Sequence, residues 1–199
     1  MGKERLDIEV DPVSGRMPAV PLRSSPHCDE RPAGQAPELI VVHAISLPPG
    51  RFGGGFVEDL FLGRLDPTAD PYFEGLRGLR VSAHLFIARD GRITQFVPFH
   101  RRAWHAGVSR YRGRARCNDF SIGIELEGTD TLPFAPLQYE ALAACIRALQ
   151  GGYPALACDA VTGHEHVAPG RKTDPGPWFD WDWLGGLLGL EPGRLPAPA

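Results

Sequence analysis

The chain has 199 residues, a formal net charge of −3 at pH 7, 43% hydrophobic residues and 23% charged residues. These values are typical of one soluble globular domain, and the slightly acidic balance gives no electrostatic support for binding nucleic acid or an anionic membrane surface. No stretch approaches the roughly 18 apolar residues that a membrane-spanning helix needs. The opening MGKERLDIEVDP lacks the apolar segment of a secretory signal, so we expect a cytoplasmic protein, with a monomer as the default.

The first predicted elements are an irregular arm and a buried strand. Residues 1–37 are rich in proline and are expected to lie as an arm on a domain at 38–190, with a flexible tail at 191–199. The run Leu-Ile-Val-Val at 39–42 is continuously apolar, which predicts a strand buried on both faces. His43 stands at the carboxyl end of this strand, where sites are built in α/β sheets.

The middle of the chain is predicted to alternate loops with short elements. Its turn residues and apolar runs predict, in order, a loop at 47–55, a short helix at 56–62, a loop at 66–78 and a hairpin of strands 81–88 and 92–97 around Asp90 and Gly91.

The last third carries the clearest patterns. Residues 120–127 alternate as a strand, with Ile122, Ile124 and Leu126 on the opposite side from Gly123, Glu125 and Glu127. A helix is predicted over 136–150, with Pro136 in its first turn and two glycines, 151 and 152, ending it. A short helix follows at 181–188. Strands mixed with a hairpin and helices predict a loop-rich, single-domain α/β fold with a central mixed β-sheet flanked by helices.

The four cysteines are not arranged for metal binding or redox chemistry. They form no C-x-x-C pair, which argues against a zinc knuckle or a dithiol motif. In a reducing compartment we expect four free thiols, at positions Cys28, Cys117, Cys145 and Cys158.

Two further segments contain candidate metal ligands besides His43. His164 and His166 occur in TGHEH, and Asp174 occurs in RKTDPGP. Two imidazoles and one carboxylate would give zinc three protein ligands and an open position for water, as in catalytic zinc sites. The spacing does not choose between His164 and His166. Each histidine could instead be a hydrogen-bonded core or surface residue.

Two charged residues are candidates for acid–base chemistry. Glu125 lies within an otherwise apolar strand, where a carboxylate is costly unless it is paired, exposed or functional. The alternative is a solvated face that it shares with Glu127. Lys172 lies two residues before Asp174, and its alternative interpretation is a solvated loop lysine.

Four residues in loops could contact a ligand. Tyr72 and Trp104 could stack on sugar rings, although aromatic residues there are more often packing residues. Arg80 and Arg116 could each bind a carboxylate by a bidentate fork, although solvated arginines are the default.

Taken together, several segments resemble the AmpD-type anhydro-N-acetylmuramyl-L-alanine amidases, part of the superfamily that includes peptidoglycan recognition proteins and phage lysozyme-amidases. PHCDERP at 26–32 resembles the family's N-terminal arm. The other matching segments, in order and with similar spacing, are LIVVHAISLPPGRFGG (39–54), DPYFEGLRGLRVSAHLFIARDG (70–91), RAWHAGVS (102–109), RCNDFSIGIELEGTD (116–130) and TGHEHVAPGRKTDPGP (162–177).

The resemblance implies a zinc enzyme that hydrolyses the amide bond between anhydro-N-acetylmuramic acid and L-alanine in muropeptides, in cytoplasmic peptidoglycan recycling. It implies His43 and Asp174 as zinc ligands. The family's second histidine ligand follows Thr-Gly, which selects His164 over His166.

The resemblance also implies roles for residues around the metal. The catalytic pair is expected at Glu125 and Lys172. The expected muropeptide contacts are Tyr72, Arg80, Trp104 and Arg116. One departure is Ala44, where the family usually has Asn, and this change could retune binding of the peptide stem without touching the metal.

Two other functions remain open on the sequence. Some members of the superfamily have lost the metal ligands and only bind peptidoglycan, whereas this chain keeps residues able to bind zinc at all three matched positions. An exported amidase acting on the intact cell wall is the other alternative. Neither the net charge nor the motifs support a nucleic-acid binder.

Overall fold

The computed structural model describes residues 8–196 of the chain, and a five-stranded sheet lies at its centre. The strand order is β4-β3-β8-β2-β9, and all neighbours are parallel except β3 and β4. The strands are β2 (Leu39–Ile45), β3 (Leu85–Ile87), β4 (Ile93–Gln95), β8 (Ser121–Glu127) and β9 (Val161–Gly163). The predicted mixed sheet is confirmed, and its two long central strands are the two that the sequence patterns predicted most clearly.

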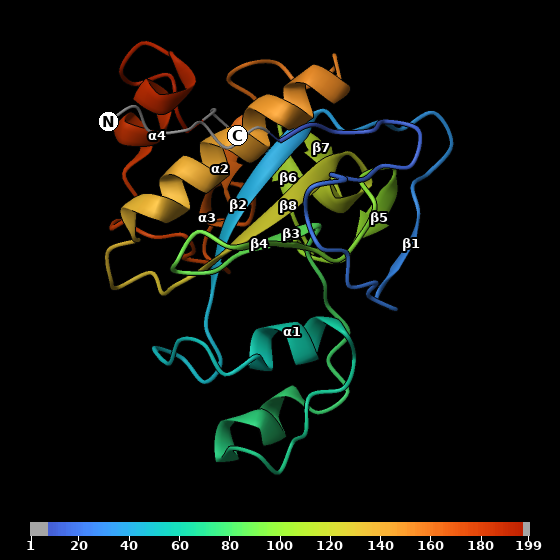
Figure 1. Cartoon of the computed structure of the whole chain (residues 1–199), viewed down its shortest axis with the longest axis vertical. Coiled ribbons are helices and arrows are strands. Elements are labelled where there is room, and N and C mark those ends of the chain that lie inside the picture. Colours follow the sequence, from blue (N-terminus) through green and yellow to red (C-terminus); the bar gives the residue numbers. More distant parts are fainter. Residues whose placement is uncertain (1–7, 197–199) are drawn as a thin grey trace.

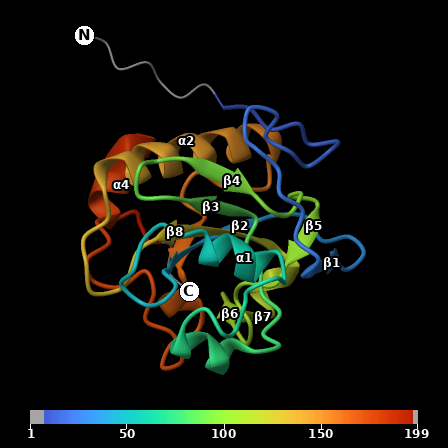
Figure 2. The ribbon, with the colours of Figure 1, turned by 60° about the horizontal axis from the view of Figure 1, so that its bottom comes forward.

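One face of the sheet is covered by helices α2 (Pro136–Gly152) and α4 (Trp181–Leu188) (Figures 1 and 2). Every second residue of the central strands belongs to the apolar core under these helices. These residues are Ile40 and Val42 of β2 and Ile122, Ile124 and Leu126 of β8. The alternation predicted for residues 120–127 is therefore confirmed, and Glu125 points to the other face.

The other face is covered by loops and short elements. Leu39 and Val41 of β2 pack there with Cys117, Phe120 and Val167. The short elements on this side are the strands β6 (Arg110–Tyr111) and β7 (Arg114–Ala115), the 3-10 helix η2 (Cys117–Asp119) and the helix α3 (His164–Val167). Because apolar groups cover both faces, β2 and β8 are buried throughout most of their length.

Residues 46–82 form a separate wall beyond the carboxyl ends of the parallel strands. Helix α1 (Phe56–Phe61) and the 3-10 helix η1 (Pro71–Leu76) stand off the sheet in Figure 1. Their own apolar cluster includes Phe61 and Phe73 and meets Phe86 and Phe96 of the β3–β4 region. This cluster holds the wall in place opposite the sheet.

The N-terminal segment is fastened to the domain by backbone pairing and by one buried cation. Strand β1 (Cys28–Glu30) pairs antiparallel with β5 (Arg101–Ala103). The guanidinium of Arg31 donates hydrogen bonds of 2.8–3.2 Å to the backbone carbonyls of Phe99, Asn118, Asp119 and Ser121. Burial lowers the pKa of Arg31 to about 10, so it stays charged at neutral pH.

Several predicted boundaries were wrong. Helix α2 runs through both glycines and ends at Gly152, two residues later than predicted, and the backbone N–H of the next residue, Tyr153, still donates to Leu149. The predicted loop at 66–78 contains η1, which Asp70 caps by accepting the backbone N–H of Tyr72 at 2.9 Å. Of the strand predicted at 81–88, only Leu85–Ile87 forms a strand. The helix predicted at 181–188 is confirmed.

Three other predictions concern the division of the chain into segments, the state of the cysteines and the absence of a membrane-spanning helix. The division into 1–37, 38–190 and 191–199 stays a prediction, and residues 1–7 and 197–199 lie outside the described residues. All four cysteines are free thiols. Between residues 8 and 196, no helix is both long and apolar enough to span a membrane.

Candidate active site

Two neighbouring parallel strands deliver two histidines to the same edge of the sheet. His43 lies near the carboxyl end of β2, and His164 begins α3 directly after β9, the strand beside β2. The loop after α3 returns to the same edge because the backbone N–H of Glu165 donates to the carbonyl of Asp174 at 2.8 Å. Residues more than 120 positions apart thus converge at one point.

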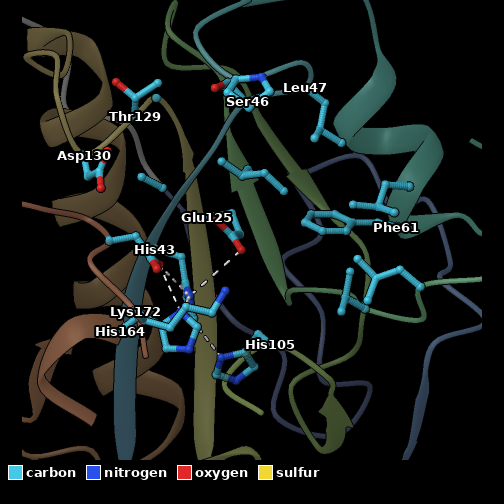
Figure 3. Close-up of a pocket in the computed structure, with 18 of the residues that line it drawn as sticks. His43, Ser46, Leu47, Phe61, His105, Glu125, Thr129, Asp130, His164 and Lys172 are labelled. Carbon is cyan, nitrogen blue, oxygen red and sulfur yellow. Dashed lines mark hydrogen bonds and ion pairs between the residues drawn. The ribbon is translucent and has the colours of Figure 1, made fainter. Parts of the chain in front are cut away.

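The three predicted ligands place one atom each around a common centre (Figure 3, which labels the two histidines). Nδ1 of His43 lies 2.9 Å from Nδ1 of His164. Oδ2 of Asp174 lies 3.2 Å from the first nitrogen and 3.0 Å from the second. Ligand atoms of a tetrahedral zinc ion with bonds of about 2.0–2.1 Å lie about 3.3 Å apart, so these atoms need to move only slightly to share an ion.

His166 does not join this cluster. Its Nδ1 accepts the backbone N–H of Gly163 at 3.2 Å, and its ring lies edge-on to Trp181. Of the two histidines that the spacing left open, the structure therefore brings His164 to the other two ligands.

The protonation states of the cluster suit a cation. Nε2 of His164 lies 3.2 Å from the carbonyl of Ala106, which can only accept, so Nε2–H donates to it and Nδ1 is the ring nitrogen that faces the cluster. Burial, and then the charge of His164, lower the pKa of His43 to about 4, so its ring is neutral at pH 7. Burial alone would raise the pKa of Asp174, but the contacts with His164 and His43 outweigh burial and hold the pKa below its usual range. Two imidazoles and one carboxylate are a donor set that fits a divalent ion such as zinc.

Glu125 lies beside this cluster with an unused carboxylate oxygen. It pairs with His43 in the register of β2 and β8, and its Oε1 is 4.0 Å from Nδ1 of His43. Its Oε2 is buried and accepts no hydrogen bond within residues 8–196. Burial and the negative charge of Asp174 raise the pKa of Glu125 well above the ordinary value, while Lys172 opposes them. A buried carboxylate with an open lone pair at a metal-type cluster is placed to accept a proton.

Glu127, on the same face of β8, is different. Its Oε1 accepts the backbone N–H of Gly53, and its Oε2 accepts that of Arg89 at 3.1 Å. The solvated face shared by the two glutamates, weighed as the alternative for Glu125, is absent because both residues are buried.

The cluster lies in a pocket of about 520 Å³. His43, His164, Glu125 and Lys172 lie on one side of it, and Phe61 lies across from them on the wall formed by residues 46–82 (Figure 3). The charge of Lys172 lowers the pKa of Glu125 and so partly offsets the effect of burial and Asp174. The pocket therefore combines the cluster, a candidate base and a cation.

The four predicted substrate contacts are placed differently from one another. Tyr72 and Trp104 line the pocket, and the indole Nε1 of Trp104 donates to Asp29 at 3.1 Å. Arg80 lines an adjoining cavity. Three leucines, Leu60, Leu76 and Leu79, line both this cavity and the pocket. Arg116 is exposed and forms an ion pair of 3.1 Å with Asp119. The structure thus brings the two aromatic residues, but not the two arginines, to the pocket of the cluster.

One residue at the site was missed by the sequence reasoning. Nδ1 of His105 lies 2.9 Å from Nε2 of His43, and its ring packs against Gly123, where an added Cβ would come within 2.4 Å of the imidazole. A single histidine in RAWHAGVS carries no spacing signal. The glycine within an apolar strand was the available clue, because a strand glycine often marks a close approach.

Comparison with known proteins gives consistent results. The profile of the N-acetylmuramoyl-L-alanine amidase family (Amidase_2) matches residues 33–177. The 1,6-anhydro-N-acetylmuramyl-L-alanine amidase AmpD of Salmonella typhimurium (strain SL1344) is 60% identical over 167 residues, which cover 84% of this chain and 89% of that protein.

Two solved structures are also similar. A crystal structure of a selenomethionine derivative of AmpD has a TM-score of 0.86 and 57% identity, covering 89% of this chain and 98% of that one. The amidase AmiD from E. coli, in complex with the substrate anhydro-N-acetylmuramic acid-L-Ala-D-gamma-Glu-L-Lys, has a TM-score of 0.57 and 30% identity, covering 81% of this chain and 61% of that one.

A mixed sheet with two imidazoles, a carboxylate and an unpaired glutamate at its carboxyl edge is the arrangement of a hydrolase that can hold a divalent metal. The chain belongs to the N-acetylmuramoyl-L-alanine amidase family and is an enzyme of that class. The predicted family and fold are confirmed.

Proposed function

We propose that the protein hydrolyses the amide bond between 1,6-anhydro-N-acetylmuramic acid and L-alanine of muropeptides and that it requires zinc. The observation that carries the zinc requirement is the convergence of Nδ1 of His43, Nδ1 of His164 and Oδ2 of Asp174, with separations of 2.9–3.2 Å. The anhydro sugar is the one named both for the Salmonella relative and for the substrate in the AmiD complex.

The placement of the side chains supports the catalytic roles that we assign. His43, His164 and Asp174 would hold the zinc, which when bound would supply a Lewis acid and lower the pKa of water towards about 7. The open Oε2 of Glu125 accepts a proton from the attacking water and then passes it to the nitrogen of the leaving L-alanine. The ammonium of Lys172 stabilises the negative charge that develops on the carbonyl oxygen.

The substrate contacts extend this arrangement. Tyr72 and Trp104, both at the pocket, offer ring faces to the sugar. We assign Arg80 and Arg116 to carboxylates of the peptide stem. Arg80 would meet the stem in the adjoining cavity, and Arg116 would exchange its ion pair with Asp119 for a stem carboxylate. The setting we propose is peptidoglycan recycling in the cytoplasm, by a monomer.

The test combines metal analysis with a product assay. The purified protein should contain close to one zinc per chain and should release free peptide from anhydro-N-acetylmuramyl peptide, as followed by chromatography. A chelator should abolish release, and added zinc should restore it. A metal-free protein that stays active would contradict the zinc requirement, and binding without release would favour a peptidoglycan-binding module instead.

The specificity and the setting need their own measurements. Equal rates on anhydro- and reducing-end muropeptides would contradict the preference for the anhydro sugar. Recovery of the native protein from outside the cytoplasmic fraction would favour the exported alternative.

A further inference from the structure

A single dipeptide contacts both of the histidines in the metal-type cluster. The ring of His105 faces His43, with Nδ1 of His105 2.9 Å from Nε2 of His43. The carbonyl of the next residue, Ala106, lies 3.2 Å from Nε2 of His164. Both contacts are made by the nitrogen that points away from the cluster. They therefore decide which ring nitrogen of each histidine is left with a lone pair.

The proton positions along these contacts are mutually consistent. The Nε2–H of His164 donates to the Ala106 carbonyl, because a carbonyl has no proton to give. When Nδ1 of His43 binds a metal, its Nε2–H donates to Nδ1 of His105. The remaining nitrogen of His105 then donates to Oγ of Ser121 at 3.2 Å. Every donor in this chain meets an acceptor.

The dipeptide is itself held by one side-chain oxygen. Oδ1 of Asn118 accepts the backbone N–H of His105 at 3.2 Å and that of Ala106 at 2.8 Å. Asn118 lies in η2, whose backbone carbonyl at this residue accepts the buried guanidinium of Arg31 at 3.0 Å. The position of Asn118 is thus fixed by a buried residue that does not line the pocket.

Two further contacts limit the movement of the dipeptide. Nη2 of Arg171 donates to the Ala106 carbonyl at 2.5 Å. Gly123 leaves space for the His105 ring, since any Cβ there would overlap it. The dipeptide is therefore fastened at its backbone, at its carbonyl and at its ring.

From this geometry we propose that Asn118 and His105 are positioning residues, which orient His43 and His164 for metal binding through the dipeptide 105–106. Neither residue needs to touch the metal or the scissile bond. The inference rests on the proposed function, because it assumes that the cluster binds zinc. Outer-shell partners of metal ligands typically contribute about 10–100-fold to metal affinity.

The test compares zinc affinity across paired variants, measured by competition with a chromophoric chelator. Asn118→Ala removes the shared acceptor and should weaken zinc binding by about 10–100-fold. Asn118→Asp keeps an oxygen in the same position and should restore most of the affinity. His105→Leu should weaken binding similarly, whereas His105→Asn should rescue it, because its amide oxygen can take the place of Nδ1.

A second readout separates positioning from loss of the fold. The visible spectrum of the Co²⁺-substituted protein should change in Asn118→Ala and His105→Leu and return towards wild type in the conservative variants. Gln138→Ala is the matched control. Gln138 is a buried amide that also bonds backbone groups, at Ala135, Ile87 and Glu127. This variant should lower the melting temperature of the metal-free protein yet leave zinc affinity and the cobalt spectrum unchanged.

The outcomes are distinguishable. Wild-type protein that binds no zinc contradicts the proposed function. Wild-type protein that binds zinc, together with Asn118→Ala and His105→Leu that bind it equally well, overturns only the positioning role. Failure of the two conservative variants to rescue also overturns it, since the acceptor oxygen would then not be what matters.

Discussion

At the scale of single residues, environment rather than residue type separates function from structure. Glu125 and Glu127 are two positions apart on the same face of β8, and both are buried. Both oxygens of Glu127 accept hydrogen bonds from backbone N–H groups, whereas one oxygen of Glu125, beside the histidine cluster, accepts none. A sequence pattern cannot make this distinction, because it shows only that the two residues share a face.

Substitution of glutamine at these two positions should affect different properties, the rate of hydrolysis at Glu125 and the stability of the fold at Glu127. Glu125→Gln removes the proton acceptor, so the rate of amide hydrolysis should fall by about 10²–10⁴-fold while the zinc content stays at the wild-type level. Glu127→Gln should lower stability by about 1–3 kcal/mol, because one backbone N–H loses a carboxylate acceptor. Hydrolysis assays, metal analysis and urea unfolding measure the three quantities. A fully active Glu125→Gln enzyme would show that another group is the base.

His84 makes stability depend on pH. Burial, and then the charge of Arg31, hold its pKa well below the ordinary value, and its Nδ1 accepts the backbone N–H of Gly123 at 3.0 Å. The unfolded chain takes up a proton below about pH 6.5, but the folded one does not. The contribution of this residue is therefore present at neutral pH and is lost as the pH falls below about 6.5, at up to about 1.4 kcal/mol per pH unit.

The measurement is urea unfolding between pH 7.5 and 5. His84→Gln should flatten the decline in stability relative to wild type, whatever it does to stability at pH 7.5. Equal slopes for the two proteins would mean that His84 does not stay neutral in the folded state.

At the scale of elements, long periodic segments could be predicted and short ones could not. The patterns of β2, β8, α2 and α4 were sufficient, because each buries its own apolar residues. Strands such as β5 and β9 have only three residues, and their pairing depends on partners far away in the chain. The candidate site divides in the same way. The motifs identified His43, His164 and Asp174, but the role of Asn118 and His105 depends on which loop packs against β8.

Strand β8 also contains a position where one methyl group should be disruptive. Gly123→Ala would put a Cβ 2.4 Å from Cγ of His105, which should cost about 1–3 kcal/mol through overpacking and displace that ring. Gly151→Ala in α2 is the control, because nothing lies within 4 Å of its added Cβ. It should be neutral or stabilise by up to about 1 kcal/mol. Thermal unfolding compares the two variants, and a harmless Gly123→Ala would show that His105 can move freely.

At the scale of the whole molecule, two separate parts of the chain enclose the pocket, the edge of the sheet and the wall formed by residues 46–82. The sheet edge carries the histidines and Glu125, while residues 46–82 form the facing wall with an apolar cluster of their own. The loop at 47–55 and the short helix after it were predicted, but η1 and the position of the wall over the sheet were not. That position depends on Phe61 and Phe73 meeting Phe86 and Phe96.

Metal should stabilise the molecule as a whole, since its three ligands come from separate segments. Zinc at about 100 times its dissociation constant should add about 2.7 kcal/mol to the free energy of unfolding, and a chelator should remove this increment. Asp174→Asn should reduce the zinc-dependent shift in melting temperature, while Asp182→Asn, in α4 away from the cluster, should retain it. A melting temperature that is indifferent to zinc in the wild type would argue against a site that links these segments.

The order of the ligands along the chain has a consequence for biosynthesis. A nascent polypeptide that has emerged from the ribosome as far as residue 160 offers only His43 from the cluster, because His164 and Asp174 are still to come. If the cluster binds zinc as proposed, loading of the ion comes late in maturation and is coupled to docking of the final segment beside β2. Cells starved of zinc should then accumulate full-length chains without bound metal.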